Sequence, residues 1–152
     1  MWLDEMFMAE FFYAQYALLF EESNHLDDIA LQLTLMKKRM RDAKTGLLHH
    51  RYDETRQQAW ADPKTGRLPS FWGRAVGSYC MALVDTVDFF PSTHVAERED
   101  LVAVLQGLVE AAAKVQDPAM GVCRWEVLDQ GERQGSHLES STSCIFVYGL
   151  YL

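Results

Sequence analysis

The hydrophobic positions divide the chain into apolar segments and amphipathic segments that alternate along it. Residues 1–20 contain neither Gly nor Pro and are apolar on almost every side, which predicts a long buried helix. Residues 25–42 place hydrophobic side chains at helical spacing and keep one charged face, which predicts an outer helix. The same order returns with an apolar helix over 71–90 and an amphipathic helix over 95–116, and a third apolar helix begins near residue 139.

Polar connections separate these helices. Residues 42–69 form a long loop with two copies of an Asp-x-Lys-Thr-Gly turn, which end at Gly46 and Gly66. A loop of this length inside a compact domain is usually functional. A related turn begins at Asp117, and the weak alternation over 122–131 predicts a short hairpin.

The apolar helices begin near residues 3, 71 and 139, so the pattern repeats about every 68 residues. Apolar helices that alternate with amphipathic ones predict an all-α ring of helical hairpins, with the apolar helices inside. In such a ring the starts of the inner helices and the long loops lie on one side. We therefore expect one common opening surrounded by Asp4, His49, His50, Trp72, Arg74 and Glu139.

The chain starts just before one inner helix and stops inside another, so the sequence predicts a partial ring. We expect residues 1–152 to form a single domain that is one part of a larger protein.

Composition and charge narrow the classes of partner. The net charge is −8, the pI is near 5.0 and no basic run occurs, which argues against nucleic acid and anionic membrane surfaces. Cys80, Cys123 and Cys144 form no CxxC pair and predict reduced thiols in a cytoplasmic protein. The first helix lacks the basic start of a signal peptide, and its carboxylates argue against a membrane span.

Four motifs occur in order along the chain: Trp2-Leu-Asp-Glu-Met-Phe-Met-Ala-Glu10, Gly46-Leu-Leu-His-His-Arg-Tyr-Asp-Glu54, Phe71-Trp-Gly-Arg-Ala-Val-Gly-Ser-Tyr79 and Leu138-Glu-Ser-Ser-Thr-Ser143. Together they resemble the unsaturated glucuronyl hydrolases and especially the unsaturated rhamnogalacturonyl hydrolases, glycoside hydrolase families 88 and 105. The resemblance implies an (α/α)6 barrel, which agrees with the repeat. Family members are more than twice as long, so this chain resembles their later half.

The resemblance also implies a reaction that starts with hydration. Enzymes of this kind protonate the C4=C5 bond of a terminal unsaturated uronic acid, water adds at C5, and the hemiketal opens and releases the remaining sugar. The implied partner is an unsaturated uronyl-terminated oligosaccharide from pectin, and no cofactor is implied.

Residue by residue, Asp4 occupies the place of the family's acid/base, whereas four residues match substrate-binding positions: Met8, His50, Trp72 and Arg74. Ser78 stands where the family often has a second Trp. A second essential carboxylate of the family lies upstream of the residues present, so we expect weakened or absent hydration by this chain alone.

Each candidate residue also has a simpler structural interpretation. Asp4 and Glu139 could cap their helices, His50 could bond to backbone, Trp72 could pack in the core, and Arg74 could pair with a loop carboxylate such as Asp62. The pair His49–His50 followed by Asp53 is compatible with metal binding, but further ligands are missing at usable spacing, so no metal is predicted.

A second hypothesis comes from a different functional class. The chain could be a noncatalytic half-barrel that serves as a binding or self-assembly module, with two copies closing a ring of six hairpins as a homo-oligomer. Another enzyme with the same ring of helices, a lyase or an epimerase, would not carry these motifs together.

Overall fold

The computed structural model describes residues 1–120 and 124–150. Their helices are α1 (Glu5–Leu19), α2 (His25–Met40), α3 (Gly73–Val87), α4 (Val95–Ala113) and α5 (Ser140–Gly149). Two short strands, β1 (Arg124–Trp125) and β2 (Leu138–Glu139), pair in antiparallel fashion. The all-α prediction and the order of the helices are therefore confirmed.

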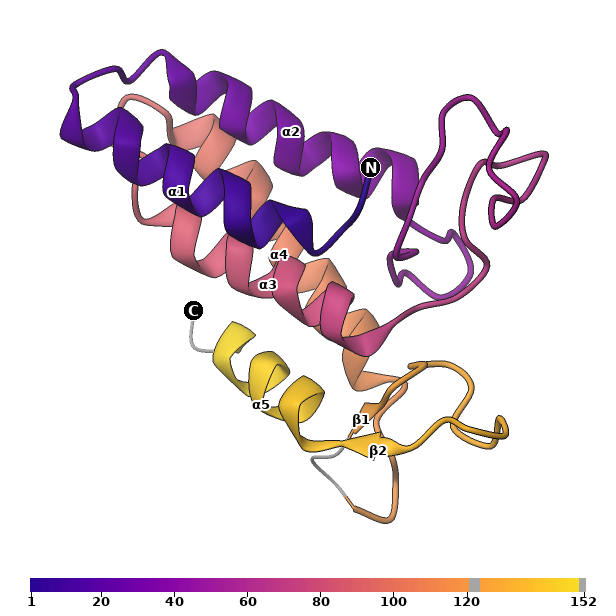
Figure 1. Cartoon of the computed structure of the whole chain (residues 1–152). Helices are drawn as coiled ribbons and strands as arrows, with labels where there is room; N and C mark the ends of the chain where they lie inside the picture. Colours follow the sequence, from indigo (N-terminus) through magenta and orange to yellow (C-terminus); the bar gives the residue numbers. More distant parts are fainter. Residues whose placement is uncertain (121–123, 151–152) are drawn as a thin grey trace.

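The helices form two layers (Figure 1). In the inner layer α3 packs between α1 and α5, and in the outer layer α2 and α4 pack against each other and cover α1 and α3 respectively. The loop between α2 and α3 lies at the end of the molecule where the inner helices begin. This is the arrangement that the sequence repeat predicts, a segment of an (α/α)6 barrel.

The core lies between the two layers because the outer helices have one apolar stripe each. On α2 the stripe includes Ile29, Leu33 and Met36, all fully buried and spaced three or four residues apart. Tyr79 of α3 is also fully buried, and its hydroxyl donates to the carbonyl oxygen of Leu33 at 2.6 Å. This hydrogen bond joins the inner layer to the outer one.

The prediction that the first helix is buried on every side is wrong for this chain. Met8, Phe12 and Leu19 are 76%, 66% and 77% exposed. They lie on a side of α1 against which no described helix packs, because α2 and α3 cover the other sides. Within the described residues no helix is both long and apolar enough to cross a membrane.

The two repeated turns have the same geometry. The amide of Gly46 donates to the Asp42 carbonyl at 2.9 Å, and that of Gly66 donates to the Asp62 carbonyl at 2.8 Å. Both glycines have a positive φ, +80° and +74°, a region that residues with a Cβ rarely adopt. The turns reverse the loop twice, so that residues 48–52 run back to the start of α1.

The predicted hairpin over 122–131 is wrong in its pairing. β1 pairs with β2, so the residues between them form an intervening loop rather than a second strand. The turn at Asp117 is present, since the Asp117 carboxylate accepts the amides of Ala119 and Met120. Residues 121–123, which include Cys123, lie outside the described residues.

Candidate active site

The start of α1 is fixed to the long loop by backbone hydrogen bonds. Trp2 and Arg51 form an antiparallel bridge, and the amide of Leu3 donates to the His50 carbonyl at 3.0 Å. Leu3 is fully buried and holds this contact in the core. The first motif and the second motif of the sequence therefore meet at the N-terminal end of the inner layer.

Asp4 does not act as a helix cap. It occupies the N-cap position of α1, but its side chain makes no hydrogen bond to the first turn. Its Oδ1 lies 3.2 Å from Nε2 of His50 instead. In the tautomer with its proton on Nε2, His50 donates to this oxygen. The capping interpretation of Asp4 and the backbone-only interpretation of His50 are thus both wrong.

His50 is a buried histidine between two tryptophans. It is 6% exposed, its ring meets Trp2 edge to face at 5.5 Å, and Trp72 lies 4.7 Å away on a tilted plane. Burial lowers the pKa of His50 below its ordinary value of 6.5; the Asp4 charge opposes this shift and the Arg51 charge adds to it. His50 is therefore neutral at pH 7.

Arg74 lies beside this group at the start of α3. Its guanidinium is 4.3 Å from the ring centre of Trp72 and forms an ion pair with Glu139, not with Asp62 as the structural interpretation supposed. Trp72 is half-buried and contacts the core as well as His50 and Arg74.

Glu139 stands at the N-cap position of α5 without bonding to the amides of its first turn, so the capping prediction for it is wrong. The Glu139 carboxylate accepts the Ser141 and Thr142 hydroxyls and pairs with Arg74. Burial alone would raise its pKa, but the hydrogen bonds from Ser141, Arg74 and Thr142 hold that pKa below its usual value. Glu139 is therefore an anion that orients Arg74.

Sequence reasoning missed one cation, Arg51. Its guanidinium lies 3.6 Å from the ring centre of Trp2, and its buried Nε has no hydrogen-bond partner among the described residues. The signal was present, since Arg51 directly follows His50 in the second motif.

The other residues named from the sequence lie farther from this group. Met8 is one turn after Asp4 on the uncovered side of α1, and Ser78 is one turn after Arg74 and half-buried. His49 turns away from His50: its Nδ1 bonds the Leu68 carbonyl at 2.8 Å. Among residues 1–120 and 124–150, no three His, Cys, Asp or Glu side chains are grouped to hold a metal ion.

The arrangement places a partly exposed carboxylate, a neutral histidine and two arginines beside Trp2 and Trp72. A carboxylate held by a neutral histidine can exchange a proton with a bound molecule. The arginines can attract an acidic group.

Comparison with known proteins finds relatives of this chain. The sequence model of Glycosyl Hydrolase Family 88 matches residues 1–152. Protein Atu3128 of Agrobacterium fabrum is 37% identical over 107 residues, which are 69% of this chain and 43% of that protein. The 24.9 kDa protein in the picA locus of Rhizobium radiobacter shows the same identity and coverage.

Solved structures of glycoside hydrolases share the fold of this chain. A glycoside hydrolase of family 105 from C. acetobutylicum ATCC 824 superposes with a TM-score of 0.94 at 45% identity, over 99% of this chain and 41% of that one. A family 88 glycosyl hydrolase from Bacteroides vulgatus shares the fold, with a TM-score of 0.76 at 21% identity over 97% of this chain and 40% of that one. The chain thus spans less than half the length of the proteins that it matches. It belongs to glycosyl hydrolase family 88.

Proposed function

We propose that this chain carries the acid/base part of an enzyme that hydrates the C4=C5 bond of unsaturated uronyl-terminated oligosaccharides, with Asp4 as the acid/base. The observation that carries the proposal is the partly buried Asp4–His50 pair at 3.2 Å, with an arginine on each of the neighbouring tryptophans Trp2 and Trp72. A carboxylate that only capped α1 would bond to backbone amides, which Asp4 does not do.

The substrate chemistry fits a single carboxyl group with two roles. In an unsaturated uronic acid C5 carries the ring oxygen, so C4=C5 is an enol ether that accepts a proton at C4. The charge that develops at C5 is shared by the ring oxygen, and water adds there. Asp4 gives the first proton and takes one from the water, so its protonation state is restored. The C5 hemiketal then opens to a ketone, and the hemiacetal left at C1 releases the remaining sugar.

The neighbours of Asp4 have distinct roles in this proposal. His50 holds Oδ1, and Oδ2, which has no hydrogen-bond partner among the described residues, faces the substrate. Arg74 meets the uronate carboxylate, since its guanidinium has five N–H donors and Glu139 does not occupy them all. Trp72 and Met8 line the side of the sugar.

We propose more specifically that the substrate is an unsaturated galacturonyl-rhamnose, as formed in pectin degradation. Its support is the likeness to the family 105 hydrolase at 45% identity and the motif pattern of the rhamnogalacturonyl enzymes. We also propose a cytoplasmic location, which fits the unpaired thiols of Cys80 and Cys144.

The test separates binding from chemistry. Fluorescence of Trp2 and Trp72 should report saturable binding of unsaturated galacturonyl-rhamnose to both the unchanged chain and Asp4→Asn. Loss of the unsaturated uronate absorbance should occur only with Asp4 present, even if slowly. Hydration that survives Asp4→Asn, or an absence of binding at any concentration, would refute the proposal.

A second candidate is a noncatalytic, self-assembling half-barrel. The observation that favours it is the exposed apolar side of α1, where Phe12 and Leu19 are uncovered, together with exposed Val147 on α5. Light scattering should then show a dimer that Phe12→Ser with Leu19→Ser dissociates. A monomer at all concentrations would exclude this candidate.

A further inference from the structure

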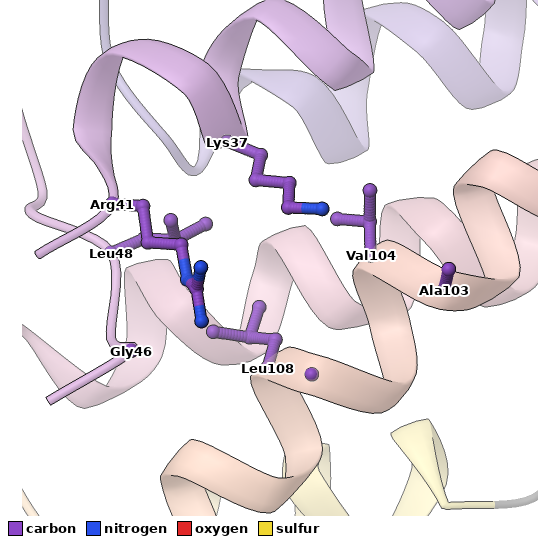
Figure 2. Close-up of a pocket in the computed structure, with 8 residues that line it drawn as sticks. Lys37, Arg41, Gly46, Leu48, Ala103, Val104 and Leu108 are labelled. Atoms are coloured by element: carbon purple, nitrogen blue, oxygen red, sulfur yellow. The ribbon is translucent and has the colours of Figure 1, made fainter. Parts of the chain in front are cut away.

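A hollow lies between the outer helices α2 and α4, on the side of the outer layer rather than at the opening that contains Asp4 (Figure 2). Its volume is about 120 Å³, and the side chains that matter most in it are Lys37, Arg41, Leu48, Val104 and Leu108. None of these residues belongs to the proposed active site. The hollow therefore needs its own explanation.

Two cations of α2 converge on this hollow. Lys37 and Arg41 are one helical turn apart, and Figure 2 shows the Lys37 amine directed toward Val104 and the Arg41 guanidinium directed toward Leu108. Neither side chain has an ion pair or a hydrogen bond with another described residue. Like charges at this spacing repel each other. The helix dipole favours cations near the end of α2, but it does not explain why both line one hollow, Lys37 half-buried and Arg41 exposed.

The floor of the hollow is apolar. Leu48, Val104 and Leu108 are each less than 5% exposed. Gly107 leaves the hollow open, because a Cβ at this position would meet no heavy atom within 4 Å. The hollow thus combines an apolar floor with a cationic wall.

The first of the repeated turns closes one end. A Cβ on Gly46 would lie 3.1 Å from Cβ of Ala111, so only glycine lets the turn approach α4 this closely. The same position is 3.7 Å from Nη2 of Arg41, which places the guanidinium against the turn. The Asp42–Gly46 turn therefore fixes one wall of the hollow.

We propose that this groove binds a small monocarboxylate with a short apolar chain. The carboxylate pairs with Lys37 and Arg41, and the chain lies on Leu48, Val104 and Leu108. Because a cavity of about 150 Å³ holds benzene, a hollow of this volume suits about five or six non-hydrogen atoms, as in butyrate. The hollow continues into a more open one that is lined by Asp100 as well as by Lys38, so these two added charges offset each other.

The experiment is a titration of the full chain with sodium butyrate, followed by NMR shifts of the backbone amides of α2 and α4. A ligand of this size should bind with a Kd of about 1 mM. Lys37→Met and Arg41→Met keep the aliphatic stem and remove the charge, so each should weaken binding about fivefold to tenfold. Lys114→Met removes a cation outside the groove and should change nothing.

Gly107→Leu tests the shape rather than the charge. It keeps both cations and places a side chain in the hollow, where a Cβ has space, so it should fold normally and abolish binding. Binding by Gly107→Leu equal to that of the unchanged chain would overturn the proposal. So would inorganic phosphate binding more tightly than butyrate, or an absence of saturation. Circular dichroism melts verify that each variant is folded.

Discussion

The inner helices α1 and α3 are built from similarly apolar sequences but have different surroundings. In α3 eleven of the fifteen residues are buried, whereas in α1 only three of fifteen are. The difference arises because α3 packs on α1, α4 and α5, whereas α1 packs only on α2 and α3 among the described helices. Identical position in the repeat therefore does not give identical burial.

The residues of the two helices match these surroundings. On the side of α3 that faces α5, Gly77 is so close that an added Cβ would lie 2.5 Å from Cγ2 of Ile145. On the uncovered side of α1 stand bulky residues such as Phe12 and Leu19. Small residues mark a close helix–helix contact within the described chain, and large uncovered ones mark a surface suited to a further contact.

The largest expected effect comes from truncating a buried side chain of α3, and the same truncation on the uncovered side of α1 is its comparison. Leu83→Ala in α3 removes a fully buried side chain and should lower the free energy of unfolding by about 2 to 5 kcal/mol. Phe12→Ala in α1 removes a side chain that is 66% exposed and should cost less than about 0.5 kcal/mol. Urea denaturation of both variants at low protein concentration measures the two values.

A large loss of stability in Phe12→Ala would contradict the comparison. If that loss grew with protein concentration, the face of α1 would be covered by a second copy. The self-assembly candidate would then gain support over an uncovered surface.

A smaller effect on the free energy of unfolding is expected from replacing a helical glycine by alanine. Gly77→Ala forces Ile145 of α5 away and should destabilise the chain by about 1 to 3 kcal/mol. Gly107→Ala in α4 is the matched control, because its Cβ meets nothing within 4 Å and alanine should add about 0.5 to 1 kcal/mol of stability. A melting temperature that rose for Gly77→Ala as it does for Gly107→Ala would show that α3 and α5 are not closely packed.

Much of this fold could be predicted from the sequence because apolar and amphipathic helices alternate with a fixed period. The Asp-x-Lys-Thr-Gly turns at residues 42–46 and 62–66 were also predictable, since glycine is needed where φ is positive. The pairing of β1 with β2 was not, because two-residue strands leave no periodic signal. The uncovered side of α1 was not predictable either, because periodicity records hydrophobicity and not which neighbour is present.

The motifs predicted that Asp4, His50, Trp72 and Arg74 would lie near one opening, and the structure brings them together. The motifs did not predict which residues form ion pairs with each other. The Arg74–Glu139 ion pair joins residues 65 positions apart. Such a partner choice depends on how α3 and α5 pack, which no local pattern encodes.

The covered side of α1 contains a titratable residue, and its titration can be used to compare the covered side with the uncovered one. Glu10 is 6% exposed and its Oε2 has no partner among the described residues. Burial, with a smaller contribution from the Asp28 charge, raises its pKa from 4.5 to about 7. A raised carboxyl pKa means that the folded state binds the proton more tightly, so stability should fall as the pH rises from 4.5 through 7.

Glu10→Gln removes this ionisation. The variant should therefore lose less stability than the unchanged chain between about pH 5 and pH 8, by roughly 1 to 3 kcal/mol. Urea midpoints at the two pH values measure the difference. Glu99→Gln, at an exposed carboxylate of α4, is the control and should keep the pH dependence of the unchanged chain. Equal pH dependence in Glu10→Gln and the unchanged chain would mean that Glu10 is hydrated.

The smallest expected effect concerns His50 at the start of α1 and has the opposite sign. Burial lowers the pKa of His50, so the unfolded chain binds a proton more readily and stability should fall as the pH drops below 6.5. Replacing His50 by Gln keeps a donor for Asp4 but removes the titration, which should flatten stability over this range. NMR of the His50 ring should independently give a pKa under 6.5. A value above 6.5 would mean that the Asp4 charge outweighs burial in setting the pKa of His50.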